Sequence, residues 1–364
     1  MSTNTEHLAY AYGGPVATGK IKAIPEDFFV DELLGFEPGG EGEHVFLHIE
    51  KRALTTLAVR DKIAALASCK SMDVGYSGLK DKWAVTRQWF SVYLPGGDQL
   101  DWQSLAEQAS SDNSSGAYIK LLTVCRHSRK LRRGAHKANA FKLVVSSLSV
   151  SASTDDLNEQ LTLKIKALCE QGVPNYFGEQ RFGKSNLPKA RALFSANKRM
   201  PREQRSLCLS AARSYLFNRV LDARIAANNW STYVDGDVLM LDGSRSRFVL
   251  DAESDSVAGS SEKMAAEIEL RLAQGDIHIS GPMCGRGSSG VTAAAEQLED
   301  AAIADEIALV EGLDRQGVDV ARRPLRCFPK QFEWQLEGEK CHLSFILPTG
   351  SYATVLIREL VECL

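Results

Sequence analysis

Several segments of the chain alternate apolar and polar residues with the two-residue period of a β-strand. Between Glu43 and Lys51, Val45, Leu47 and Ile49 fall on one face of such a strand. Runs rich in aromatic and β-branched residues predict further strands at 86–95, 117–125, 141–148, 331–336 and 342–347. The first of these ends at Pro95, which cannot continue a sheet ladder.

Other segments have the longer period of an amphipathic helix. Thr55 or Thr56 is placed to cap a helix whose apolar positions are Leu57, Ile63, Ala64 and Leu66. Further helices are predicted at 155–171, at 206–227 with basic residues on the outer face, and at 292–311 with an acidic surface. A last helix starts at Thr354 or at the preceding turn and runs through the segment 348–362. Strands and helices therefore interleave along the chain, which predicts a mixed α/β fold.

The length and composition indicate a folded protein of more than one domain. At roughly 150 residues per domain, the 364 residues correspond to about two domains, and 44% hydrophobic and 24% charged residues are ordinary for globular proteins. No apolar run reaches the roughly 18 residues of a membrane helix, and the first residues lack the pattern of a signal peptide. We therefore expect a cytoplasmic protein without a membrane partner.

The cysteines and histidines give no metal signature. The eight cysteines are dispersed without a C-x-x-C pair, so we interpret them as reduced thiols. His44 and His48 lie on one predicted strand, where a rise of about 3.3 Å per residue separates their rings by about 13 Å. Two rings at that distance cannot share an ion, so no metal site is expected.

The charge is segregated, although the net charge is only −3. Seven Lys or Arg residues and no acid lie between Arg126 and Lys142, and eleven basic residues face only Glu203 and Asp222 between Arg181 and Arg224. On charge alone, two such segments fit a positive surface for the phosphates of a nucleic acid and ordinary solvated helix faces equally well. The residues that we assign to it are Arg126, Arg129, Lys130, Arg132, Arg133, Lys137, Arg181, Lys184 and Arg213.

The segment GRGSSG at 285–290 has the spacing of a dinucleotide-binding loop. A dinucleotide site also needs a second, buried parallel strand after the following helix. The segment after the predicted 292–311 helix is polar and contains several arginines, so we interpret GRGSSG as a turn and expect no nucleotide cofactor.

The loop between Gly75 and Val85 contains a candidate catalytic carboxylate. Gly75 and Gly78 allow unusual backbone angles, and Asp81 stands at the tip between Lys80 and Lys82. A carboxylate between two cations stays ionised and can serve as a nucleophile or a base. From the local residues alone, however, a solvated, charged turn is the favoured interpretation.

This loop and five other motifs resemble the TruD family of tRNA pseudouridine synthases. The matching segments are GKIKAIPEDFFVDEL at 19–33, GLKDKWAVTRQWFS at 78–91, RKLRRGAHKANAF at 129–141, PNYFGEQRFG at 174–183, GPMCG at 281–285 and LPTGSYATVLIREL at 347–360. They occur in the family's order and span nearly the whole chain. They also make GRGSSG an extension of the GPMCG motif.

The resemblance implies a fold, a reaction and a set of site residues. The fold is a pseudouridine-synthase catalytic core, formed by residues 1–169 and 325–364, into which a TRUD domain of residues 170–324 is inserted. Asp81 matches the catalytic aspartate, and Lys22 matches a lysine that can pair with it. Phe28, Asn139 and Phe141 match residues of the uridine pocket, as does Tyr352, where the family commonly has Phe.

The implied substrate is the uridine at position 13 in the D arm of tRNA, which is isomerised without a cofactor. We expect the RNA to bind in a cleft between the two domains, because each carries one basic segment. Two other classes remain: an RNA-binding protein or RNA chaperone that lacks catalysis, and a nucleotide-dependent oxidoreductase that uses GRGSSG.

Overall fold

The computed structural model describes residues 8–96, 100–106, 116–150, 154–183, 185–196, 199–250 and 260–364. The chain divides into two compact units. The sheet unit consists of Ala17–Asn158, Pro329–Gly350 and Val361–Leu364, and the helical unit consists of Met1–Val16, Glu159–Phe328 and Ser351–Leu360. The fold is mixed α/β, as the interleaved pattern predicts. The family-based division at 170 and 324 stays a prediction, and it differs from these units at both termini.

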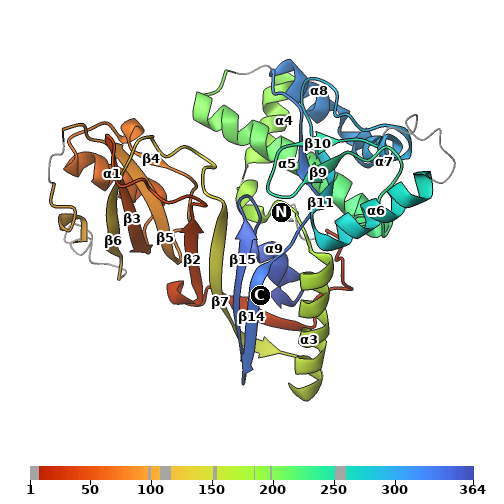
Figure 1. Ribbon diagram of the computed structural model, residues 1–364, viewed down its shortest axis with the longest axis horizontal. Helices are drawn as coiled ribbons and strands as arrows, with labels where there is room; N and C mark the ends of the chain where they lie inside the picture. Colours follow the sequence, from red (N-terminus) through yellow and green to blue (C-terminus); the bar gives the residue numbers. More distant parts are fainter. Residues whose placement is uncertain are drawn as a thin grey trace. The chain divides into compact units, whose positions relative to one another are not determined.

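In the described residues, the sheet unit contains one ten-stranded mixed sheet (Figure 1). The main path of the sheet runs in the order β14-β15-β7-β2-β5-β3-β6, with β1, β4 and β16 joined to it. The strands are β1 (Ala17–Ile21), β2 (Phe28–Leu33), β3 (His44–Arg52), β4 (Gly75–Tyr76), β5 (Val85–Tyr93), β6 (Tyr118–His127), β7 (Ala138–Ser149), β14 (Lys330–Glu337), β15 (Lys340–Pro348) and β16 (Val361–Cys363). All six strands predicted from periodicity are present.

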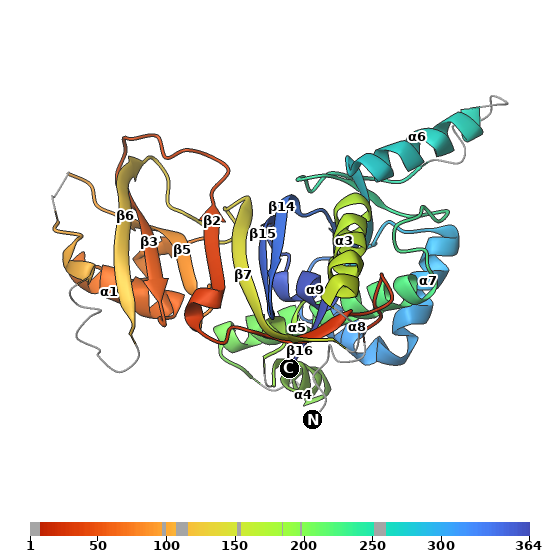
Figure 2. The same cartoon turned by 90° about the horizontal axis from the view of Figure 1, so that it is seen from below.

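Helix α1 (Thr56–Leu66) covers one end of this sheet (Figure 2). Its N-cap is Thr55, whose side chain accepts a hydrogen bond from the Ala58 amide. Ile63 is buried against β3 and β5 as predicted, whereas Leu57 is exposed and Val59 packs into the core instead.

The helical unit combines helices with a small sheet. Its helices are α3 (Thr154–Gln171), which begins in the sheet unit's part of the chain, α4 (Asn186–Ala196), α5 (Arg202–Ala226), α6 (Ser260–Gln274), α7 (Ala293–Ile303), α8 (Ile307–Arg315) and α9 (Ala353–Arg358). Its strands are β8 (Val173–Pro174), β9 (Leu239–Leu241), β10 (Arg247–Phe248), β11 (Ile277–Met283), β12 (Ala321–Pro324) and β13 (Arg326–Cys327). A core of apolar residues joins α4, α5 and α8.

Two helix predictions need correction. The acidic segment 292–311 is not one helix: α7 ends at Ile303 and α8 starts at Ile307, where the buried carboxylate of Glu306 accepts two hydrogen bonds from Arg191. The last helix ends at Arg358, and β16 follows it because Val361 and its neighbours pair in parallel with β1. Sheet pairing overrides the local helical pattern there.

Not all basic residues of α5 lie on its outer face. Arg224 is only 2% exposed, and both of its terminal nitrogens bind the buried carboxylate of Asp237 at 2.8 and 3.0 Å. A buried guanidinium needs such a partner, so this charge stabilises the interior of the helical unit.

Candidate active site

The Asp81 carboxylate lies on the loop between β4 and β5 and forms an ion pair with Lys22. Lys22 Nζ is 2.5 Å from Asp81 Oδ2, and both side chains are partly exposed. The Lys22 ammonium also lies 4.2 Å from the centre of the Phe28 ring. The pairing expected for Lys22 is therefore present, and it holds an accessible carboxylate beside an aromatic side chain.

The two lysines next to Asp81 in the sequence have different surroundings. Lys80 points into the protein, where its Nζ is 3.1 Å from Glu32 Oε2. Lys82 is exposed at the surface of the loop. Lys80 is thus paired with Glu32, and Lys22, which comes from a distant segment, supplies a cation at the Asp81 carboxylate.

The loop glycines also act differently from the prediction. Neither Gly75 nor Gly78 has a positive φ angle. Gly75 instead allows close approach, since a Cβ atom there would stand 2.4 Å from the carbonyl oxygen of Leu131. The amide of Gly134 donates to the carbonyl of Ser77 at 2.8 Å. The first basic segment is thus attached directly to the start of the Asp81 loop.

Lys51 supports Asp81 from inside the protein. It is fully buried, and its Nζ donates to the carbonyl oxygens of Leu54 at 2.7 Å and Asp81 at 2.9 Å. Burial lowers the pKa of Lys51 to about 8. We did not predict this residue. Its signal was present, because Lys51 falls on the same strand face as the buried Leu47 and Ile49.

A buried polar network orients the amide of Asn139. Its Oδ1 accepts a hydrogen bond from Lys80, whose charge is balanced by Glu32. Its Nδ2 donates to His136 Nε2 at 3.3 Å, and His136 Nδ1 is 2.5 Å from Ser77 Oγ. Burial raises the pKa of Glu32 and lowers that of His136 to about 4, so the imidazole is neutral at pH 7. Glu32 and His136 are site residues that the sequence prediction missed.

The two predicted aromatic residues of the sheet unit pack together on the same side of the sheet. Phe28 and Phe141 are both buried, with ring centres 6.3 Å apart in an edge-to-face arrangement. Phe141 also contacts Phe345 at 5.4 Å. The rings form a firm apolar wall next to Lys22 and Asn139.

Tyr352, the remaining predicted pocket residue, belongs to the helical unit. It occupies the N-cap position of α9, and its ring lies edge-on to Phe177 at 6.1 Å. The hydroxyl of the neighbouring Ser351 donates to Asn175 Oδ1 at 3.0 Å. Residues of the PNYFGEQRFG motif thus hold Tyr352 in place.

The first basic segment contains both structural and exposed cations. Arg126 donates to the carbonyl oxygens of Gly42 and Leu94, and Lys130 donates to that of Met72. Arg133 lies 3.6 Å from the centre of the Tyr76 ring. The side chains of Arg129, Arg132 and Lys137 are exposed to solvent.

In the second basic segment, Arg181 and Arg213 form hydrogen bonds within the helical unit. Arg213 donates to the carbonyl oxygens of Met283 and Asp319, both at 2.9 Å, and burial lowers its pKa. Arg181 Nε donates to Ser214 Oγ at 3.2 Å. Lys184 lies outside the described residues.

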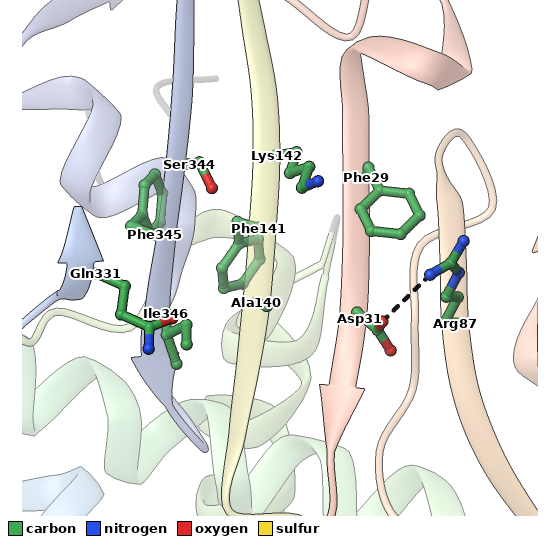
Figure 3. Close-up of a pocket in the computed structure, with 10 residues that line it drawn as sticks. All are labelled: Phe29, Asp31, Arg87, Ala140, Phe141, Lys142, Gln331, Ser344, Phe345 and Ile346. Atoms are coloured by element: carbon green, nitrogen blue, oxygen red, sulfur yellow. Dashed lines mark ion pairs between the residues drawn. The ribbon is translucent and has the colours of Figure 1, made fainter. Parts of the chain in front are cut away.

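A groove of about 410 Å³ opens on the other face of the sheet (Figure 3). Phe29 and Lys142 line it as cross-strand partners, and Asp31 pairs with Arg87 at 3.6 Å. Successive strand residues point to opposite faces. Phe29, Asp31 and Lys142 therefore line the groove from the face opposite to Asn139, and the predicted pocket residue Phe141 lines it as well.

GRGSSG is not a dinucleotide loop. The preceding strand β11 pairs antiparallel with β9, and the chain that returns after α7 and α8 forms β12, which is also antiparallel to β11. A dinucleotide site requires a parallel βαβ unit. This geometry confirms the interpretation of GRGSSG as a turn.

The two histidines of β3 lie against aromatic side chains. His48 stacks on Trp89 with ring centres 4.5 Å apart, and His44 lies against Tyr93. Within the described residues, no three His, Cys, Asp or Glu side chains are grouped to hold a metal ion. No helix in this part of the chain has the length and apolarity to span a bilayer.

Comparisons with known proteins agree along almost the full chain. The family model "tRNA pseudouridine synthase D (TruD)" matches residues 4–190 and 185–360. A protein of Methylococcus capsulatus named tRNA pseudouridine synthase D is 43% identical over 361 residues, which cover 98% of this chain and 95% of that protein. One of Aeromonas hydrophila with the same name is 41% identical, with 98% and 94% covered. The crystal structure of a putative tRNA pseudouridine synthase D from Methanosarcina mazei has the same fold, with a TM-score of 0.68, 20% identity, and 96% and 95% of the two chains covered.

Proposed function

This chain belongs to the tRNA pseudouridine synthase D (TruD) family, and from this premise we propose that Asp81 is its catalytic residue and uridine 13 of the tRNA D arm its target. As a tRNA pseudouridine synthase it is an isomerase that acts on tRNA. The observation that carries the proposal is the accessible Asp81 carboxylate, paired with Lys22 at 2.5 Å and supported from below by the buried Lys51.

The reaction needs a carboxylate and no change in oxidation state. The N1–C1′ glycosidic bond breaks, the uracil turns, and a C5–C1′ bond forms while the C5 hydrogen leaves and N1 gains a proton. Asp81 can attack C1′, add to the pyrimidine ring or abstract a ribose proton, and each route uses an ionised carboxylate oxygen. Lys22 stabilises that charge. Because no electrons are gained or lost, the proposal includes no cofactor.

Asn139 is the residue proposed to form hydrogen bonds with the uracil base. Lys80 and His136 fix its amide orientation, and the Nδ2 group has a second proton to donate to a uracil carbonyl. Extracting the uridine from its stack costs a few kcal/mol. Hydrogen bonds to the base and contact with the aromatic residues Phe28 and Phe141 offset that cost.

The basic residues next to the Asp81 loop are the proposed phosphate contacts. Arg129, Arg132 and Lys137 are exposed in the segment that is attached to Ser77. Cations placed there attract the tRNA backbone, and binding through them weakens steeply as salt is added.

The test uses tRNA transcribed with tritium at uracil C5, because formation of the C5–C1′ bond expels that atom into water. Wild type, Asp81→Asn and the control Asp73→Asn are compared, since Asp73 is an exposed acid outside the site. We expect release by wild type and Asp73→Asn and none by Asp81→Asn. A transcript with cytidine at position 13 should abolish release by wild type.

Two outcomes would contradict the proposal. Tritium release by Asp81→Asn at the wild-type rate would remove Asp81 from the chemistry. Unchanged release from the cytidine-13 transcript would assign the target to another position. Binding without release by any of the proteins would instead favour the RNA-chaperone interpretation.

A further inference from the structure

Large apolar side chains are exposed around the Asp81–Lys22 pair. Leu79 is 61% exposed and Trp83 is 50% exposed, each two residues from Asp81 along the chain. Ile24, two residues after Lys22, is 53% exposed. Exposed apolar side chains that lie close together often mark a binding surface. We call these three residues the apolar rim; of them, Trp83 directly contacts the Lys22 backbone.

Trp83 is fixed in the rim by a specific hydrogen bond. Its indole Nε1 donates to the carbonyl oxygen of Lys22 at 3.0 Å. Lys22 has a φ angle of 58°, in the left-handed region that non-glycine residues seldom adopt. The bond therefore fixes the indole and also supports the backbone of the lysine that pairs with Asp81. An aromatic ring held in advance loses little freedom on binding.

The surroundings favour a nucleobase as the occupant. Lys82, adjacent to Trp83, is exposed, and the basic segment attached at Ser77 supplies further cations for phosphates. Flat aromatic side chains beside such cations are the usual elements of contact with unstacked RNA, because every base offers a π-face. A uridine withdrawn from its stack also leaves an adjacent base with one face uncovered.

We propose that the Trp83 indole stacks on the nucleobase adjacent to the target uridine and holds the opened RNA at Asp81. This inference rests on the proposed function, because it takes the uridine at Asp81 as the target. Trp83 acts as an RNA-contacting residue, whereas its N–H group positions Lys22. These two contributions can be separated by substitution.

The test compares Trp83→Ala, Trp83→Phe and the control Tyr93→Ala. Tyr93 is a similarly exposed aromatic residue, at 48%, near the other end of β5. Dissociation constants for unmodified tRNA are measured by filter binding at one salt concentration, and single-turnover tritium release is measured at saturating enzyme. We expect Trp83→Ala to weaken tRNA binding about ten- to a hundredfold, the range for loss of one base stack. Trp83→Phe and Tyr93→Ala should bind within about twofold of wild type.

Thermal unfolding confirms that each variant is folded, and Trp83→Phe keeps the test valid if Trp83→Ala does not fold. An unchanged tRNA affinity of Trp83→Ala would overturn the inference. A loss of tRNA affinity in Trp83→Phe as large as that in Trp83→Ala would also overturn it, since the indole N–H would then be the essential group. These results are independent of the wild-type comparison with Asp81→Asn. A wild-type protein that binds tRNA without releasing tritium contradicts the proposed function, whatever the Trp83 variants do.

Discussion

The buried ion pair between Glu32 and Lys80 offers a sharp test of how the site is held. Substituting Glu32→Gln removes the negative charge while keeping the shape and an acceptor for the Trp89 amide. The Glu32 and Lys80 side chains are 0% and 7% exposed, with a separation of 3.1 Å. Removing one partner of a buried pair leaves an uncompensated charge and costs about 3–5 kcal/mol.

The exposed pair between Arg52 and Glu26 is the matched control. Its separation of 2.6 Å is shorter, yet the Glu26 side chain is 50% exposed, so solvent screens the attraction. Glu26→Gln should therefore cost no more than about 1 kcal/mol. The comparison separates burial from distance as the source of the energy.

The double variant Glu32→Gln/Lys80→Met completes the cycle. Removing both charges should restore about 2 kcal/mol relative to the sum of the single variants, because Met leaves no buried ion. Urea unfolding, fitted with one transition for each compact unit, measures these differences. If Glu32→Gln costs no more than Glu26→Gln, or if the effects of the single variants simply add, the buried pair does not stabilise the site.

Three further predictions concern Lys51, His136 and two arginines of the basic segments. Lys51→Met should lower kcat of tritium release about ten- to a hundredfold with little change in KM, since the carbonyl of Asp81 loses its anchor; an unchanged kcat would refute this. The pKa of His136 is about 4 in the folded protein and about 6.5 in the unfolded chain. Between pH 4 and pH 6.5 the unfolded state therefore binds more protons than the folded state. Stability should then fall by up to about 3 kcal/mol as pH drops from 6.5 to 4, and urea unfolding of His136→Gln should show a smaller fall. Arg132→Glu should weaken tRNA binding and reduce its salt dependence without changing Tm. Arg213→Glu should lower Tm, because Arg213 donates to two backbone carbonyl oxygens. Equal Tm values for the two variants would contradict this difference.

The secondary structure of this protein is largely determined by local sequence. Apolar residues two positions apart predicted β3 and its neighbours, and the Thr55 cap marked the start of α1. The loop that carries Asp81 was also predicted from the sequence, because the residues of its motif are contiguous. Even the buried Lys51 was implied by the two-residue period, since it shares a strand face with Leu47 and Ile49.

Only the tertiary structure decided which charges meet. Lys22 and Asp81 are 59 residues apart, as are Lys80 and Asn139, and the pairing of β2 with β7 places Glu32 opposite Asn139. Periodicity specifies the face on which a side chain lies, but the partner on that face depends on strand order and register. Burial then sets the strength of each contact, because a charge removed from water requires a partner that the local sequence does not identify.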